Sequence, residues 1–250
     1  MNFFVEQEQI KDKKIYIKGM DVNHIKNVLR YKEDTVLNVV CKTTNINYKA
    51  KIEKFLENEI ECEVLEKIEN IKKKVKIDIY QGLPKADKME LIIQKCSEIG
   101  VNKIVPVAMR RCVVKLDGKD ATKKKERWQT IAEVAAKQCM RDDILEIEMV
   151  TSLKEVCKRI KDYDIVLVAY EKETNKYLKE ELEKLKEKNT EETTIAFVVG
   201  PEGGFEESEV QDLIDNGAKS VSLGKRILRT ETAPIVVSTI IMYEIGDIGG

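Results

Sequence analysis

The chain has 250 residues, of which 42% are hydrophobic and 36% are charged, so it can build a packed core in one large domain or two smaller ones. Its 44 basic and 45 acidic residues nearly cancel, so the overall charge indicates no polyanionic partner, and a nucleic-acid site has to come from local clustering. The six cysteines form no CxxC pair and His24 is the single histidine, which argues against a metal site.

The cysteine spacing and the chain ends bear on the compartment. Scattered cysteines fit a reducing cytosol better than a disulfide framework. The first residues, MNFFVEQEQI, lack a basic region followed by an apolar run, which argues against a secretory signal. The longest apolar stretch, around residues 234–243, is too short and interrupted to span a bilayer. We therefore expect a cytoplasmic protein that does not enter a membrane.

Residues 1 to about 70 carry the pattern of a small barrel. Alternating apolar and polar residues, clearest where Ile60, Cys62 and Val64 alternate with glutamates, predict short half-buried strands. A short helix is predicted at Asp21–Arg30, with Asp21 as its N-cap. Several short strands in so few residues are typical of a barrel. The predicted strands are 15–18, 36–41, 48–55 and 60–68.

From about residue 73 the pattern changes to alternating strands and helices. We interpret the lysine run before it, Lys72–Lys74, as a linker. Asp87 and Glu90 have capping-box spacing at the start of one helix, and Gly100 ends it. This alternation predicts a parallel α/β sheet covered by helices on both faces. The predicted strands are 75–81, 103–108, 146–150, 164–169, 194–199 and 220–223, and the predicted helices are 86–100, 122–141, 152–160, 174–188, 206–216 and 232–243.

The last of these segments supports two interpretations. Its run of isoleucine and valine favours a strand by propensity. Thr232 shortly before Pro234 is instead typical of a helix start. We predict a helix over Thr232–Tyr243.

The most informative motif is AFVVGPEGGF at Ala196–Phe205. A buried strand runs into three glycines within five residues, and a helix with acidic first-turn residues follows. Ligands of parallel sheets bind beyond the carboxyl ends of strands, and glycines let the backbone approach them closely. An ordinary tight strand-to-helix turn would also explain the glycines. The chain lacks GxxxxGK[ST], and no GxGxxG follows its first strand, so the common nucleotide fingerprints do not apply.

A second motif, SLGKRILRTETAP at Ser222–Pro234, directly follows the last predicted strand. It should therefore lie at the same sheet edge as the glycine-rich loop. Two such loops converging on one edge indicate a ligand site. The segment combines a glycine, basic groups and one carboxylate, namely Gly224, Lys225, Arg226, Arg229 and Glu231.

Together, FVVGPEGGFEESEV and VSLGKRILRTETAP resemble the cofactor-binding signature of the RsmE-type 16S rRNA uracil-N3 methyltransferases, a family of the SPOUT class. The similarity continues elsewhere, in order, over essentially the whole chain. His24 with Val28–Arg30 resembles the family's HxxxVLR motif, and Lys88–Val101 resembles its lysine-rich helix before an ELGV element. Glu126–Trp128 and Ala135–Arg141 resemble its ERW and AAxQxxR helix.

The resemblance implies an α/β fold: a SPOUT methyltransferase domain at 73–250 with a C-terminal deep trefoil knot, preceded by a PUA-like β-barrel at 1–72 that binds RNA. It also implies a homodimer with the active site near the subunit interface. The implied activity is S-adenosylmethionine-dependent methylation of N3 of a specific uridine in 16S rRNA of the small ribosomal subunit.

The resemblance also implies which residues hold the S-adenosylmethionine cofactor. Backbone groups of the two motifs would bind its adenosine part, and apolar side chains would enclose the adenine. Tyr170, just beyond a predicted strand, would line the same pocket. The implied cofactor-binding residues are Tyr170, Gly200, Pro201, Glu202, Gly203, Gly204, Ser222, Leu223, Gly224, Ile227 and Leu228.

For the reaction itself, two residues of the second motif are candidates. Glu231 could accept the N3 proton as a general base. Arg229 could instead stabilise negative charge developing on O2 or O4 of the uracil. We prefer Arg229, because a carboxylate would repel the anionic base. Glu231 would then orient Arg229 or cap the last helix.

RNA contacts require local positive charge, and the segment Lys103–Arg127 carries nine basic residues against three acidic ones. A solvated basic face would look the same, but the setting favours a functional patch. We interpret His24 as structural and Trp128 as part of an apolar helix stripe. The candidate RNA-binding residues are Arg30, Arg110, Arg111, Gln138 and Arg141.

Three other functions remain open from the sequence. A SPOUT methyltransferase acting on another base or RNA would have the same fold. A non-catalytic RNA-binding protein would not need the intact GPEGG and ILRTETAP segments. A nucleotide-dependent enzyme would need a phosphate-binding lysine and metal ligands that the motifs lack.

Overall fold

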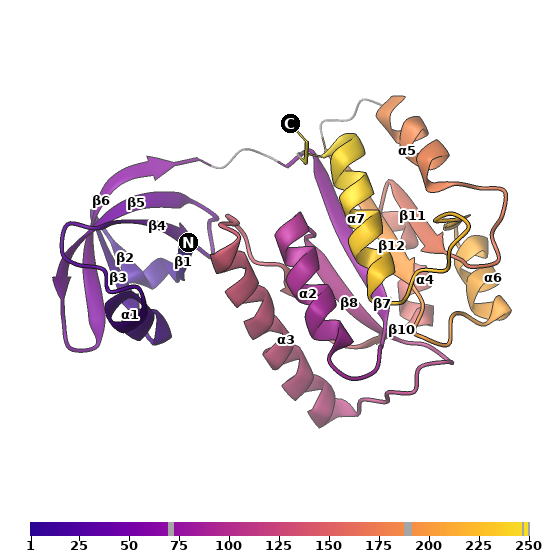
Figure 1. Cartoon of the computed structure of the whole chain (residues 1–250), viewed down its shortest axis with the longest axis horizontal. Coiled ribbons are helices and arrows are strands. Elements are labelled where there is room, and N and C mark those ends of the chain that lie inside the picture. The colour runs from indigo at the N-terminus through magenta and orange to yellow at the C-terminus, as the bar shows by residue number, and fades with distance from the viewer. Residues whose placement is uncertain (70–72, 188–191, 247, 250) are drawn as a thin grey trace. The chain divides into compact units, whose positions relative to one another are not determined.

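The computed structural model describes residues 1–69, 73–187, 192–246 and 248–249, and it divides into two compact units (Figure 1). The first unit comprises 1–72 with 134–144, and the second comprises 73–133 with 145–250. The predicted linker at Lys72–Lys74 lies partly outside the described residues.

The first unit is built on one six-stranded sheet around an apolar core. Its strand order is β1-β4-β5-β6-β3-β2, with β1 and β4 parallel and the other pairs antiparallel. The four predicted strands are confirmed. The sequence pattern missed the first two, because β1 is buried along its whole length and has no alternation to detect. The strands are β1 Asn2–Val5, β2 Ile10–Lys11, β3 Lys14–Lys18, β4 Val36–Cys41, β5 Asn47–Phe55 and β6 Glu59–Ile68.

The short helix of this unit begins differently from the prediction. It consists of α1, Met20–Asn23, followed by one π-helical turn, His24–Val28. The N-cap position is Gly19, so the assignment of Asp21 as N-cap is wrong. The Asp21 carboxylate instead pairs with the ammonium of Lys137 at 2.9 Å, and both side chains are largely buried. The Asp21 carboxylate is therefore used in a partly buried ion pair and not in a capping hydrogen bond.

The second unit contains a parallel seven-stranded sheet, as the alternating pattern predicts. The strand order is β10-β8-β7-β12-β11-β13, and β9 pairs with β8. The predicted strand at 146–150 is observed only at its start, as β9, and the short strand β10, which was not predicted, follows that range. The strands are β7 Val75–Gly82, β8 Lys103–Ala108, β9 Glu146–Ile147, β10 Thr151–Ser152, β11 Ile165–Ala169, β12 Thr193–Val199 and β13 Lys219–Val221.

Within the described residues, six α-helices follow or separate these strands near the predicted positions, although α3 begins four residues before the predicted start and α5 four residues after it. The ambiguous last segment is a helix, α7, which packs on α2, β7 and β12. No helix among the described residues is long and apolar enough to cross a membrane. The helices are α2 Lys88–Ile99, α3 Gly118–Gln138, α4 Leu153–Arg159, α5 Leu178–Glu187, α6 Glu207–Asp215 and α7 Thr232–Ile245.

The two ends of α2 test the predicted caps. Gly100 ends the helix in the left-handed conformation, with φ of 106°, as predicted. The capping box of Asp87 and Glu90 is wrong, because Asp87 occupies the N-cap position without a side-chain capping bond. Glu90 instead forms an ion pair with Arg127 at 2.8 Å.

A buried hydroxyl joins three segments of the second unit that are distant in sequence. Thr230 accepts a hydrogen bond from the Gln81 side-chain amide at 2.9 Å and donates one to the Gly200 carbonyl at 2.7 Å. The end of β7 also lies directly against the loop after β12, since a Cβ on Gly82 would stand 2.7 Å from Pro201. The chain therefore returns from β13 to α7 across the ends of β12 and β7.

We expect Thr230→Val to lower the free energy of unfolding by about 2–4 kcal/mol, because it leaves the buried Gly200 carbonyl and one N–H of the buried Gln81 amide without a partner. Urea unfolding measures this. The matched control is Thr239→Val, whose exposed hydroxyl bonds only to the Ile235 carbonyl of its own helix; it should cost less than about 0.5 kcal/mol. Equal losses in both variants would contradict a joining role for Thr230.

Candidate functional site

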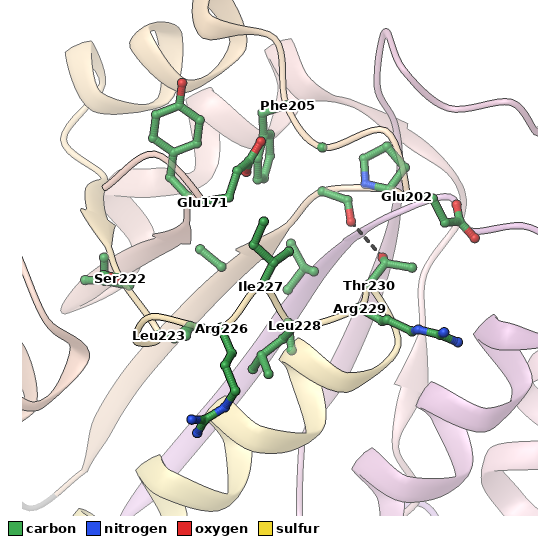
Figure 2. A pocket seen from close by; sticks show the side chains of 18 of the residues that line it. Glu171, Glu202, Phe205, Ser222, Leu223, Arg226, Ile227, Leu228, Arg229 and Thr230 are labelled. Atoms are coloured by element: carbon green, nitrogen blue, oxygen red, sulfur yellow. Dashed lines mark hydrogen bonds between the residues drawn. The ribbon is translucent and has the colours of Figure 1, made fainter. Parts of the chain in front are cut away.

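A cavity of about 530 Å³ opens at the carboxyl ends of β11, β12 and β13 in the second unit (Figure 2). Most of its wall comes from three chain segments, 169–171, 199–205 and 221–230, each of which continues one of these strands, and Lys88 and Ala233 complete the lining. This is the position at which parallel α/β sheets bind ligands.

Close approach explains two glycines of the GPEGG loop, Gly200–Gly204. Gly204 has φ of 68°, and a Cβ there would stand 2.7 Å from the Glu171 carboxylate. A Cβ on Gly203 would stand 2.9 Å from Cβ of Arg111, whose guanidinium donates to the Gly203 carbonyl at 3.1 Å. The loop is thus held closely on both sides, and no side chain of its own fills the cavity at these two positions.

Residues 222–230 of the segment 222–231 form the opposite wall, which is largely apolar where Leu223, Ile227 and Leu228 face the cavity. Gly224 has φ of 108°, which turns the chain there. Figure 2 shows Ile227, Leu228 and Leu223 along this wall. Ile227 is 83% exposed, an unusual state for so large an apolar side chain. Such a wall suits a flat apolar ligand group.

Charged groups gather at one rim of the cavity. The Lys88 ammonium lies 3.0 Å from the Glu202 carboxylate and 3.1 Å from the Glu231 carboxylate. The guanidinium of Arg229 lies 3.9 Å from the other oxygen of Glu231 and is 83% exposed. Arg229 is therefore held only loosely by its neighbour.

The pKa values of these groups follow from the pairing. The hydrogen bond to Glu202 and then that to Glu231 raise the pKa of Lys88, against the effect of burial. Burial alone would raise the pKa of Glu231, but its own backbone N–H and Lys88 lower it overall. For Glu202, burial is likewise outweighed by hydrogen bonds from the Lys85 backbone N–H and from Lys88, so its pKa is lowered. Both carboxyls are therefore charged at neutral pH, and Glu231 is a weak base.

All eleven residues predicted to bind a cofactor line this cavity, and so does Arg229. Glu231 is not in the wall, but reaches it through Lys88 and Arg229. The sequence reasoning did not assign ten of the lining residues to the site. Lys88 entered the sequence analysis only as the first residue of the motif Lys88–Val101. A lysine at a helix start, where a cation is disfavoured, is the sequence feature that could have indicated its role. The ten unassigned residues are Lys88, Ala169, Glu171, Val199, Phe205, Val221, Lys225, Arg226, Thr230 and Ala233.

The residues predicted to contact RNA fall into two groups. Three are engaged within the protein: Arg110 pairs with Glu206 at 2.9 Å, Arg111 bonds to Gly203, and Arg141 pairs with Asp143 at 3.0 Å. The Arg141 side chain is also nearly buried. Arg30 and Gln138 are exposed in the first unit.

The basic segment 103–127 divides in the same way. Lys103 pairs with Glu148, and Arg127 pairs with Glu90. Trp128 is buried, in agreement with its predicted core position. Five lysines around the start of α3 have no acidic partner among the described residues: Lys115, Lys119, Lys123, Lys124 and Lys125.

Over the part of the chain that the structure describes, no group of three or more His, Cys, Asp or Glu side chains is placed to hold a metal ion.

Comparison with known proteins places these features in a family. The RNA methyltransferase domain family matches residues 71–242. The chain is 35% identical to the ribosomal RNA small subunit methyltransferase E of Bacillus subtilis, over 97% of this chain and 96% of that protein. It is 33% identical to the enzyme of the same name from Mesomycoplasma hyopneumoniae, over 95% and 96% of the two chains. Among solved structures, the ribosomal RNA small subunit methyltransferase E of Neisseria gonorrhoeae bound to S-adenosyl methionine has a TM-score of 0.84 at 26% identity, covering 99% of this chain and 98% of that one.

The lowered pKa of Glu231 gives a pH-dependent prediction. A carboxyl whose folded pKa lies below its ordinary 4.5 stabilises the fold above that value, and this stabilisation is lost as pH falls through the folded pKa. We expect Glu231→Gln to cost about 1–2 kcal/mol at pH 7 and progressively less below about pH 4.5. Urea unfolding at pH 7, 5 and 3.5 measures the difference.

The control is Glu126→Gln, an exposed carboxyl on α3 with no ion pair among the described residues, which should show no comparable trend. A Glu231→Gln deficit that is the same at all three pH values would contradict the lowered pKa.

Proposed function

The chain belongs to the RNA methyltransferase family that includes ribosomal RNA small subunit methyltransferase E, and from this we propose that it methylates N3 of a specific uridine in 16S rRNA, with S-adenosylmethionine as methyl donor. The observation that carries the proposal is the cavity between the GPEGG loop and segment 222–231, where every residue implied to bind the cofactor converges. The choice of uracil N3 rests on the family resemblance. An rRNA substrate also implies activity in the cytoplasm.

The residues around the cavity fit S-adenosylmethionine. Gly203 and Gly204 add no side chain of their own, so a ligand can approach the backbone of this loop closely, which suits the ribose and the methionine part. The apolar wall of Leu223, Ile227 and Leu228 suits the adenine ring. When bound, the cofactor supplies a methyl group activated by a sulfonium. The sulfur leaves as a neutral thioether, so its departure needs no acid. The protein's task is therefore to position the donor and the base in line.

For the catalytic role, the geometry favours Arg229 over Glu231. Methylation at N3 requires loss of the N3 proton, which passes to solvent water, and the negative charge left on the base spreads onto O2 and O4. Arg229 is exposed at the cavity and can donate hydrogen bonds to these oxygens. Glu231 is a poor candidate for the base, because its pKa is lowered and it is engaged with Lys88. We assign Glu231 the task of orienting Arg229.

RNA binding is assigned to two exposed surfaces. One is the first unit, residues 1–72, which we propose to be a PUA-like barrel that uses Arg30, together with Gln138. The other is the lysine cluster at the start of α3, whose unpaired charges suit phosphates. We assign Arg110, Arg111 and Arg141 structural tasks in place of direct RNA contacts, because each is engaged within the protein.

Two further features of the family are proposed for the second unit. We propose that the return of segment 222–231 across the ends of β12 and β7 forms the trefoil knot, supported by the bonds of Thr230 to Gly200 and Gln81. We also propose a homodimer through α7 and α2. Tyr243 is 67% exposed, and Ile240 and Leu91 are also exposed, on two helices that pack together.

The first experiment is calorimetric binding of S-adenosylmethionine to the wild type and to Gly203→Val. We expect saturable binding to the wild type and at least tenfold weaker binding to the variant, because a side chain at Gly203 collides with Arg111 and displaces the loop. Circular dichroism checks that the variant is folded. No binding to folded wild-type protein, with or without RNA, would favour a non-catalytic RNA-binding protein.

The second experiment measures methyl transfer to small-subunit rRNA and identifies the product by nucleoside mass spectrometry, with 3-methyluridine expected. We expect Arg229→Gln to lower the single-turnover rate by about 100-fold or more while cofactor affinity changes little. Glu231→Gln should lower the rate less. A larger loss in Glu231→Gln than in Arg229→Gln would identify Glu231 as the base, and a different methylated nucleoside would indicate another SPOUT specificity.

A further inference from the structure

We propose that Lys88 is a positioning residue, whose ammonium holds the GPEGG loop and segment 222–231 in fixed register so that Arg229 meets the nucleotide at the correct place. The two contacts are those to Glu202 at 3.0 Å and to Glu231 at 3.1 Å. The inference rests on the proposed function, because the role of Arg229 is taken from it.

The location of Lys88 is unfavourable for its own helix. It is the first residue of α2, where the helix dipole disfavours a cation. The N-cap residue Asp87 makes no side-chain capping bond that would relieve this. A lysine at a position that is unfavourable for its helix indicates a favourable interaction outside the helix. For Lys88, this interaction is with the carboxylates of Glu202 and Glu231.

The two carboxylates also need a cation between them. Glu202 and Glu231 come from different segments, and their side chains are only 26% and 14% exposed. Two partly buried anions would repel each other and separate the segments that carry them. Lys88, 30% exposed, offsets both charges at once.

Each of the two carboxylates links Lys88 to a different part of the site. Glu202 also accepts the backbone N–H of Lys85 at 3.0 Å, so the start of α2 and the GPEGG loop are joined twice. Glu231 uses one oxygen for Lys88 and turns the other toward Arg229. The order Glu202–Lys88–Glu231–Arg229 thus connects the cofactor loop to the proposed catalytic cation.

This connection predicts energetic coupling. Arg229 forms no ion pair other than that with Glu231 in the described part of the chain, so its placement depends on Glu231. A substitution of Glu202, which lies in the cofactor loop, should therefore slow methyl transfer, because Lys88 and Glu231 connect Glu202 to Arg229. Without Lys88 the same substitution should have little additional effect.

The test compares Lys88→Met with Lys85→Met as the matched control. Lys85 is an exposed lysine three residues earlier whose contact with Glu202 is made by its backbone and survives the substitution. Lys88→Arg keeps the charge and should restore wild-type behaviour to within about threefold. Thermal unfolding shows whether each variant is folded.

The first readout needs neither cofactor nor RNA. Trypsin can cut segment 222–231 after three residues, Lys225, Arg226 and Arg229, and fragment masses identify each cut. We expect Lys88→Met to accelerate cleavage within this segment at least fivefold, with no acceleration in Lys85→Met. Equal cleavage rates in the two folded variants would overturn the proposal.

The second readout is the single-turnover rate of methyl transfer in a double-mutant cycle. We expect Lys88→Met and Glu202→Gln each to lower the rate by 10- to 100-fold, and the double variant to be no slower than the slower single one. Losses that multiply, or a Lys88→Met rate equal to that of Lys85→Met, would overturn the coupling. If the wild type transfers no methyl group, the proposed function fails, while the trypsin result still decides whether Lys88 holds the segment.

Discussion

The buried hydroxyl of Thr230 is the contact on which the site depends. It is bonded to the end of β7 through Gln81 and to the end of β12 through Gly200. The residues just before it, 222–229, form one wall of the cavity, and α7 begins just after it. Because water cannot replace these bonds in a buried place, the segment has one arrangement that satisfies all three groups. The cavity wall is therefore held by the same bonds that hold the fold.

Electrostatics adds a second constraint at the rim of the cavity. The chain is almost neutral overall, yet Lys88, Glu202, Glu231 and Arg229 are concentrated within a few ångströms. Their pairing keeps both carboxyls ionised and leaves the guanidinium of Arg229 exposed. A lone arginine on a mobile segment would have to be ordered at the moment of reaction. An arginine whose neighbour is already anchored costs less to place.

The same distinction between engaged and unengaged charge applies to RNA recognition. The density of basic residues along the sequence identified 103–127 as a basic segment. In the structure, however, Arg110 and Arg127 form ion pairs and Arg111 forms a hydrogen bond within the second unit. The lysines at the start of α3 keep their charge unneutralised. Counting charges along a chain cannot separate these groups, because the carboxylates that neutralise some of them come from other segments, such as Glu206 and Glu90.

The sequence by itself determined the parallel sheet and the meeting of the two motifs at one edge of it, because hydrophobic periodicity and glycine-rich turns act through local backbone geometry and both motifs follow strand ends. It left two interpretations of the segment that forms α7, and it assigned only part of the cavity wall. It failed at β1, which is buried throughout, and at the caps assigned to Asp21 and Asp87, where ion pairs of Asp21 and Glu90 with distant partners decided the outcome. Only the tertiary structure showed that Lys88 stands between Glu202 and Glu231 and that Thr230 joins β7 to β12. These contacts bring together residues far apart in the chain, and no local pattern encodes such distances.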